Sequence, residues 1–115
     1  MYRRAMIRLL IVALPIALLC ACSKSPEPFA NVQITELGQQ RWARTCAMCH
    51  VRGEGGAPRV GDRDAWAPRL AQGEDVLLAH TIDGFNNMPP LGYCMDCERE
   101  DLRAYIAFMS AGAGS

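Results

Sequence analysis

The stretch Cys46-Ala47-Met48-Cys49-His50 is the most informative part of this sequence. Residues three apart on a helical turn lie on the same face, so the two thiols would point to one side of the turn. The imidazole of His50 follows directly after the second thiol. A chain of 115 residues with six cysteines and two histidines would contain this pattern by chance only ~0.005 times. The stretch therefore indicates a site that uses all three side chains.

The spacing C-x-x-C-H is typical of covalent haem attachment. Cys46 and Cys49 would each form a thioether with one vinyl group of the porphyrin, and His50 would be the proximal iron ligand. Three other interpretations are a redox C-x-x-C, half of a zinc site, and an unmodified pair of cysteines. A redox motif requires βαβ surroundings, which the sequence lacks, and pairing with Cys94 and Cys97 leaves 44 intervening residues where zinc ribbons have about 15 to 20. Neither of these sites would use His50.

The second axial position of such an iron separates a carrier from a catalyst, because a filled position leaves no vacancy for a small ligand. Met88 is the favoured ligand, since Pro89 and Pro90 directly after it would stiffen a loop that holds the thioether over the ring. His80 is the alternative and would give a bis-histidine iron. Three other methionines are weaker candidates by their positions: Met48, Met95 and Met109.

The pattern around this motif predicts helices joined by long loops. Thr35 is a candidate N-cap for a helix that runs towards the two cysteines, and apolar spacing predicts further helices over 74–83 and 102–109. Residues 51–72 contain four glycines and two prolines and are expected to form a loop rather than one regular element. No alternating apolar run indicates a strand. We expect an all-α single domain with three to five helices and long loops wrapped around the cofactor.

The first 21 residues are expected to form a signal peptide of the lipoprotein type. Three arginines among the first eight residues precede or interrupt an apolar run over 9–19, which is too short to span a bilayer. A buried helix of the mature domain is the alternative, but Pro15 disfavours it. The run ends in a pattern that resembles a lipobox, with Cys22 as the residue to be lipidated. Simple cleavage after Ala21, leaving a soluble protein, is the other possibility.

Removal of this leader changes the charge balance of the chain. Three of the twelve basic side chains are lost, which leaves nine against twelve acidic ones and a net charge of −3. This balance argues against binding to nucleic acid, which needs a basic surface. Residues 22–33 contain two prolines among polar residues and are expected to form an extended, lipid-anchored linker. The domain itself would span residues 34–112.

Beyond the haem motif, four further segments resemble the class I c-type cytochromes, and most closely the small bacterial cytochrome c5 branch. The resemblance covers about residues 34–109, and the segments stand in the order found in that family. They are Ala57-Pro58-Arg59-Val60-Gly61-Asp62, Ala65-Trp66-Ala67-Pro68-Arg69, Gly84-Phe85-Asn86-Asn87-Met88-Pro89-Pro90 and Cys94-Met95-Asp96-Cys97.

The resemblance implies roles for residues outside the motif. Gly38 would let the first helix approach the last one near Tyr105. Pro58 would accept a hydrogen bond from the His50 ring through its carbonyl oxygen, and Trp66 would place its indole N–H near a haem propionate. A disulfide between Cys94 and Cys97, also implied, would shape the loop beside Met88.

The function implied is one-electron transfer without catalysis, in a bacterial respiratory-type chain. One covalent haem c would hold iron between His50 and Met88, and redox proteins would bind transiently as donor and acceptor. The protein would lie on the periplasmic side, joined to the membrane through a lipid on Cys22. The competing hypothesis is a haem enzyme or sensor with an open distal site.

Overall fold

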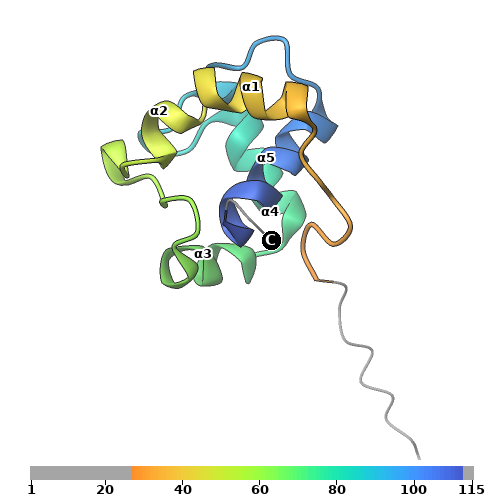
Figure 1. Cartoon of the computed structure of the whole chain (residues 1–115). Coiled ribbons are helices and arrows are strands. Elements are labelled where there is room, and N and C mark those ends of the chain that lie inside the picture. Colours follow the sequence, from red (N-terminus) through yellow and green to blue (C-terminus); the bar gives the residue numbers. More distant parts are fainter. Residues whose placement is uncertain (1–26, 113–115) are drawn as a thin grey trace, which may run out of the picture.

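Five α-helices and two short 3₁₀ helices make up the computed structural model, which describes residues 27–112 (Figure 1). No strand occurs among these residues, and the predicted all-α class is confirmed. The elements are, in chain order, α1 Glu36–Arg44, α2 Ala47–His50, η1 Glu54–Gly56, α3 Arg63–Leu70, α4 Glu74–Asp83, η2 Pro90–Tyr93 and α5 Arg99–Ala111.

Helices α1 and α5 pack against each other at Gly38, where α1 has no side chain. The Thr35 hydroxyl caps α1 by accepting a 3.0 Å hydrogen bond from the Gly38 N–H, as its position in the sequence predicts. Gly38 is buried, and a Cβ atom built on it would lie 3.4 Å from Cε1 of Tyr105 on α5. The expected close approach at Gly38 is therefore confirmed. Figure 1 shows α1 lying across α5.

The core is formed mainly by α5 and α4. Helix α5 begins with a capping box between Glu98 and Asp101, which satisfies backbone N–H groups at both positions. Its buried side chains recur at helical spacing, and they meet Leu77 and Leu78 from α4. The buried residues of α5 are Leu102, Ala104, Tyr105, Ile106 and Met109.

Helix α3 lies within the region expected to be a loop. Asp62 begins it by accepting a hydrogen bond from the Ala65 N–H at 3.1 Å, and Trp66 is its one buried residue. Pro68 lies inside the helix and removes one backbone donor. A short helix with a single buried residue and an internal proline has no apolar periodicity, which is why the sequence pattern does not predict it.

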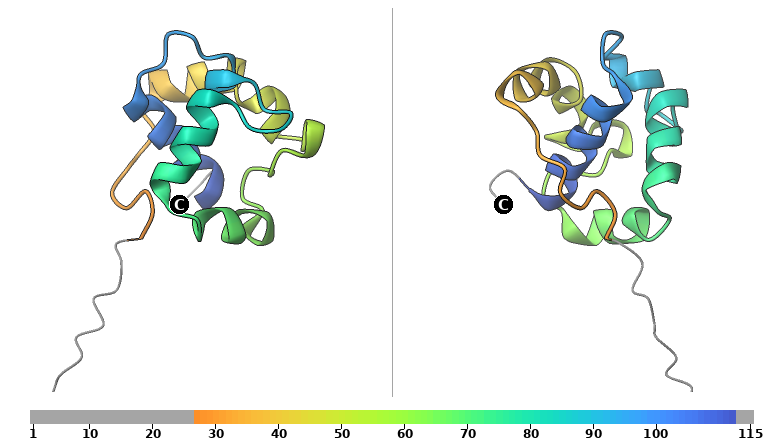
Figure 2. Two further views of the ribbon diagram at one scale, coloured as in Figure 1. Left: turned by 180° about the vertical axis from the view of Figure 1, so that it is seen from behind. Right: turned by 90° about the vertical axis from the view of Figure 1, so that its right-hand side faces the viewer.

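Residues 27–33, here called the N-terminal strap, pack on the domain although the sequence predicts an extended linker there. Phe29 is buried, and its backbone N–H donates a 2.9 Å hydrogen bond to a carboxylate oxygen of Glu74 at the start of α4. Figure 2 shows the strap descending along α5 towards the junction of α3 and α4. The predicted signal peptide and Cys22 lie outside the described residues. Within residues 27–112, no helix has the length and apolar character needed to cross a bilayer.

Candidate functional site

A cavity of about 350 Å³ lies between α2, α3, α4, α5 and the loops that join them. This volume is within the range of small-molecule sites, about 300 to 1,000 Å³. Cys46, Cys49 and His50 line it from α2 and the residue before α2, and Met88 lines it from the loop that follows α4. The four residues predicted to hold the cofactor are therefore brought together around one space.

His50 is buried and held in a defined orientation. Its Nδ1–H donates a 2.8 Å hydrogen bond to the carbonyl oxygen of Pro58, as the resemblance implies. Burial, together with the positive charge of Arg69, lowers the pKa of the imidazole, against the opposing effect of the bond to Pro58. The ring is therefore neutral with a proton on Nδ1, which leaves the lone pair of Nε2 available for a metal ion.

Neither thiol of the motif forms a disulfide, and two observations disfavour the redox and zinc interpretations. Cys46 is buried, and burial raises the pKa of its thiol despite the hydrogen bond from Thr45. Reactive redox cysteines need a lowered pKa, so the buried Cys46 thiol does not fit the redox interpretation. Cys94 and Cys97 form a disulfide with each other, so neither offers a thiolate to complete a zinc site with Cys46 and Cys49. The free thiols instead fit covalent attachment to a vinyl-bearing cofactor.

Met88 ends a tight turn that begins at Phe85. The two residues exchange backbone hydrogen bonds of 3.0 and 2.9 Å. Gly84, directly before the turn, has φ +85°, and a Cβ there would lie 3.0 Å from the Met88 carbonyl oxygen, so this position requires glycine. A Cβ built on Gly92 would be 3.7 Å from both Met88 Cε and Cys46 Sγ. The thioether of Met88 thus lies on the same side of η2 as the Cys46 thiol.

The other candidate ligands differ in where they lie. His80 lines the cavity, where its ring stacks on Phe85 with centroids 3.9 Å apart. Met109 is buried in the core and lines the cavity from α5, whereas Met48 is exposed at its mouth. Met95 is 76% exposed and does not line the cavity.

Trp66 lines the cavity, and its indole N–H has a backbone partner. Nε1 donates a 2.8 Å hydrogen bond to the backbone carbonyl oxygen of Arg59. This bond fixes the direction of the indole, and the placement of its N–H near a haem propionate stays a prediction. The ring lies nearly parallel to that of His50, with centroids 6.1 Å apart, so Trp66 contributes to the site by packing.

Several polar residues of the cavity wall were not predicted as site residues, among them Arg69 and Gln72. Arg69 and Gln72 lie three and six residues after Trp66, near the end of α3, and both line the cavity. The spacing of Arg69 from Trp66 places the two on the same face of α3, which the sequence pattern does not reveal, whereas Gln72 follows the end of α3 at Leu70. They supply hydrogen-bond donors at the edge of a largely apolar space.

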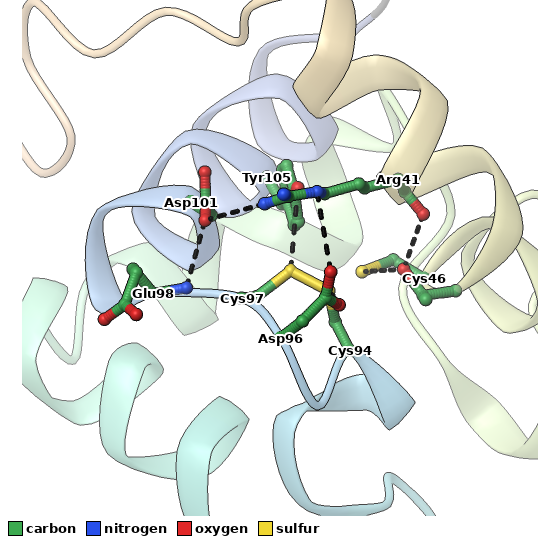
Figure 3. The surroundings of a disulfide bond; sticks show 9 residues. Arg41, Cys46, Cys94, Asp96, Cys97, Glu98, Asp101 and Tyr105 are labelled. Carbon is green, nitrogen blue, oxygen red and sulfur yellow. Dashed lines mark hydrogen bonds and ion pairs between the residues drawn. A yellow bond between two sulfur atoms is a disulfide. The ribbon is translucent and has the colours of Figure 1, made fainter.

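The disulfide fixes the loop between η2 and α5. Figure 3 shows Cys94 and Cys97 facing Tyr105 of α5, whose hydroxyl oxygen lies 3.6 Å from Cys97 Sγ. Arg41 of α1 pairs with Asp96 at 3.8 Å and with Asp101 at 3.4 Å. Burial, reinforced by nearby Asp101, raises the pKa of the Tyr105 phenol. The loop that follows Met88 is thus tied to both α1 and α5.

Exposed apolar side chains surround the mouth of the cavity. Met48, Phe85 and Tyr93 come from three separate segments and line the cavity, although each is about half exposed or more, at 57%, 49% and 65%. We call these three residues the cavity rim. Large apolar groups held at a surface around a site are typical of a place where a partner binds.

The chain resembles known cytochromes in sequence. The family model described as cytochrome c oxidase, cbb3-type, subunit III matches residues 33–109. Cytochrome c5 of Ectopseudomonas mendocina is 46% identical over 70 residues, which cover 59% of this chain and 80% of that protein. Cytochrome c5 of Azotobacter vinelandii is also 46% identical over 70 residues, covering 59% of this chain and 84% of the relative.

Solved structures give the same result. A chain in the crystal structure of an electron transfer complex of nitrite reductase with cytochrome c matches with a TM-score of 0.61 and 41% identity, covering 69% of this chain and 99% of that one. A mono-haem ferrocytochrome c from Shewanella putrefaciens matches with a TM-score of 0.59 and 40% identity, covering 72% and 99%.

These relatives are monohaem cytochromes c that act as electron carriers. The free thiols, the oriented His50 and the apolar cavity of this chain fit the same covalent group. Fold, motif and relatives together show that the chain belongs to the class I c-type cytochromes, close to the cytochrome c5 branch, and carries one covalently bound haem c with its iron.

Proposed function

We propose that this cytochrome is a one-electron carrier whose iron is held by His50 and Met88, with the porphyrin joined to Cys46 and Cys49. The observation that carries the proposal is the cavity itself, which is lined by all four of these residues. The hydrogen bond to Pro58 supports His50 as a ligand, because it fixes the tautomer that leaves Nε2 free. The turn that ends in Met88 supports the second ligand, because its backbone is closed by two hydrogen bonds.

Two axial ligands explain why the function would be transfer rather than catalysis. When bound, haem c supplies an iron that changes between the ferric and ferrous states. His50 and Met88 would occupy both axial positions and so exclude oxygen and peroxide from the metal. Apolar residues of the cavity wall, such as Leu77 and Ile106, exclude water and favour the less charged ferrous state.

Partners would dock transiently at the cavity rim. Met48, Phe85 and Tyr93 form an apolar surface at the mouth of the cavity, so a partner docked there would lie close to the haem. Interfaces of redox encounters are small, below about 1,200 Å² in total, which permits rapid release. The likeness to a cytochrome c in complex with nitrite reductase supports redox proteins as donor and acceptor.

The place of work would be the periplasmic side of a bacterial membrane, in a respiratory-type chain. The basic and apolar leader over residues 1–21 supports export, and the pattern before Cys22 supports lipidation of that cysteine. Replacement of Cys22 by serine tests the anchor. The variant is expected in the soluble fraction, whereas the unaltered protein stays with the membranes. Equal distribution of the two proteins would contradict the anchor.

The axial ligand is tested by Met88→Ala, with Met95→Ala as the matched control. Met95 is an exposed methionine on the same stretch between α4 and α5 and does not line the cavity. We expect Met88→Ala to keep the covalent haem, to lose the sulfur-to-iron charge-transfer band, and to bind carbon monoxide when reduced. Met95→Ala should retain the spectrum of the unaltered protein. An unchanged spectrum in Met88→Ala would reject Met88 as the iron ligand. Prompt binding of carbon monoxide by the unaltered reduced protein would favour a haem enzyme or sensor over an electron carrier.

A further inference from the structure

Two loops that are far apart in the sequence are joined at the mouth of the cavity. The side-chain amide of Asn87 donates a hydrogen bond of 3.1 Å from Nδ2 to the carbonyl oxygen of Gly55, 32 residues earlier. Gly55 lies in η1 with φ +62°, in the left-handed region that favours glycine. A Cβ built there would be 3.3 Å from the Cβ of Asn87, so the two loops are in close contact at this point.

Each of these loops supports one of the two proposed iron ligands. The η1 loop leads from Gly53 to Pro58, whose carbonyl oxygen accepts the hydrogen bond from the His50 ring. Asn87 lies in the turn that ends in Met88. The hydrogen bond between Asn87 and Gly55 therefore connects the loop that orients His50 to the turn that presents Met88.

Other contacts also hold the turn over residues 85–88, but they lie within the turn or come from α4. The backbone bonds between Phe85 and Met88 close the turn on itself, and His80 of α4 stacks on Phe85. Within the described residues, the bond from Asn87 joins this turn to the η1 loop. Asn87 is exposed, so this tie can open without unpacking the core.

We propose that Asn87 is a positioning residue that holds the Met88 turn closed and thereby controls how fast small ligands reach the metal. The inference rests on the proposed ligation of the iron by Met88. It assigns control of ligand access to Asn87, the residue directly before Met88. A ligand such as cyanide can bind only after the thioether has left the iron, so its binding rate reports the fraction of time the turn is open. Loss of the hydrogen bond raises that fraction.

The test is the rate of cyanide binding to the ferric haem-containing protein in two variants, Asn87→Asp and Asn86→Asp. The two residues are neighbours in the same exposed turn, and both substitutions add one negative charge. Asn86 has φ +52°, a conformation that aspartate also tolerates. Asn87→Asp removes the amide donor, and we expect binding about 5-fold faster than in Asn86→Asp, which corresponds to ~1 kcal/mol for one hydrogen bond.

A second variant approaches the same contact from the other loop. Gly55→Ala places a methyl group against Asn87, so it should also speed cyanide binding. The double variant Gly55→Ala, Asn87→Asp should be no faster than the faster single variant, because both changes open one contact.

The outcomes separate this inference from the proposed function. Equal cyanide rates in Asn87→Asp and Asn86→Asp, or fully additive effects in the double variant, would overturn the role of Asn87. A merely structural effect would lower the melting temperature of Asn87→Asp and leave its cyanide rate equal to that of Asn86→Asp. An unaltered ferric protein without a sulfur-to-iron band would instead overturn the ligation by Met88, and this inference with it.

Discussion

At the scale of single residues, Gly38 determines how closely α1 can approach α5. A Cβ at this position would lie 3.1 Å from Ile34 Cγ1, 3.1 Å from Thr35 Oγ1 and 3.4 Å from Tyr105 Cε1. The Thr35 hydroxyl also accepts the hydrogen bond that caps α1. A larger side chain would therefore disturb the cap and the helix contact together.

The substitution Gly38→Val is expected to lower the free energy of unfolding by about 1 to 3 kcal/mol, the usual cost of overpacking a core. Its matched control is Gln39→Val, which places the same β-branched side chain on the exposed side of α1. Urea unfolding of the haem-containing proteins, followed by circular dichroism, measures both. A Gly38→Val protein as stable as Gln39→Val would contradict the close approach.

The roles of individual residues could be predicted best where covalent attachment of the haem requires particular residue types at a fixed spacing. Cys46, Cys49 and His50 follow from one pattern, and Pro58 follows from the resemblance that the pattern supports. The hydrogen bond of Trp66 could not be predicted, because its acceptor is a backbone carbonyl whose position depends on how the loop before α3 folds.

At the scale of elements, the sequence predicted those helices that have periodic apolar residues and recognisable capping residues. Helix α4 begins at Glu74 and ends at Asp83, as its apolar spacing and the following Gly84 predict, and α5 contains the whole predicted segment. Helix α3 and the N-terminal strap each bury a single large aromatic side chain, Trp66 and Phe29. One buried residue in a short segment leaves no repeat to detect.

The strap should be sensitive to acid because a carboxylate holds it. The hydrogen bond from Arg103 is the main cause that lowers the pKa of Glu74 below its ordinary value of 4.5, and the Phe29 N–H acts in the same direction. A lowered pKa means that the contribution to stability is present above the ordinary value and is lost as the pH falls through the folded-state pKa.

Replacement of Glu74 by glutamine therefore tests the strap through its pH dependence. We expect Glu74→Gln to be less stable than the unaltered protein by about 1 kcal/mol at neutral pH. The difference should shrink as the pH falls below 4.5. Glu54→Gln is the control, because the structure gives Glu54 no ion pair within residues 27–112. A constant difference between Glu74→Gln and the unaltered protein at every pH would contradict the proposed charge dependence.

At the scale of the whole molecule, the fold places the cofactor cavity beside one apolar surface. The cavity rim combines residues from α2, from the turn after α4 and from η2, so it exists only in the folded chain. Its individual residues are unremarkable in the sequence. The rim could therefore not be predicted as a surface, although its place beside the haem motif could.

A charge on the rim should slow electron exchange between two copies of the protein. Met48→Lys puts a cation at the cavity mouth, and Leu37→Lys puts the same charge on α1 at a side chain of equal exposure, 57% against 58%. Because like charges meet when two rims touch, we expect self-exchange at low salt to fall about 5-fold or more in Met48→Lys relative to Leu37→Lys. Line broadening in mixtures of ferric and ferrous protein measures the rate. Equal rates in the two variants would place the electron-transfer surface elsewhere.

The central claim is a haem bound through two thioethers with both axial positions of its iron filled. The most direct measurement combines the intact mass with the ferric and ferrous spectra of the protein made in a bacterium able to attach haem. We predict a mass increase of one haem, a sulfur-to-iron charge-transfer band in the ferric form, and no prompt binding of carbon monoxide by the ferrous form. A colourless protein, or a five-coordinate iron that binds carbon monoxide at once, would contradict it.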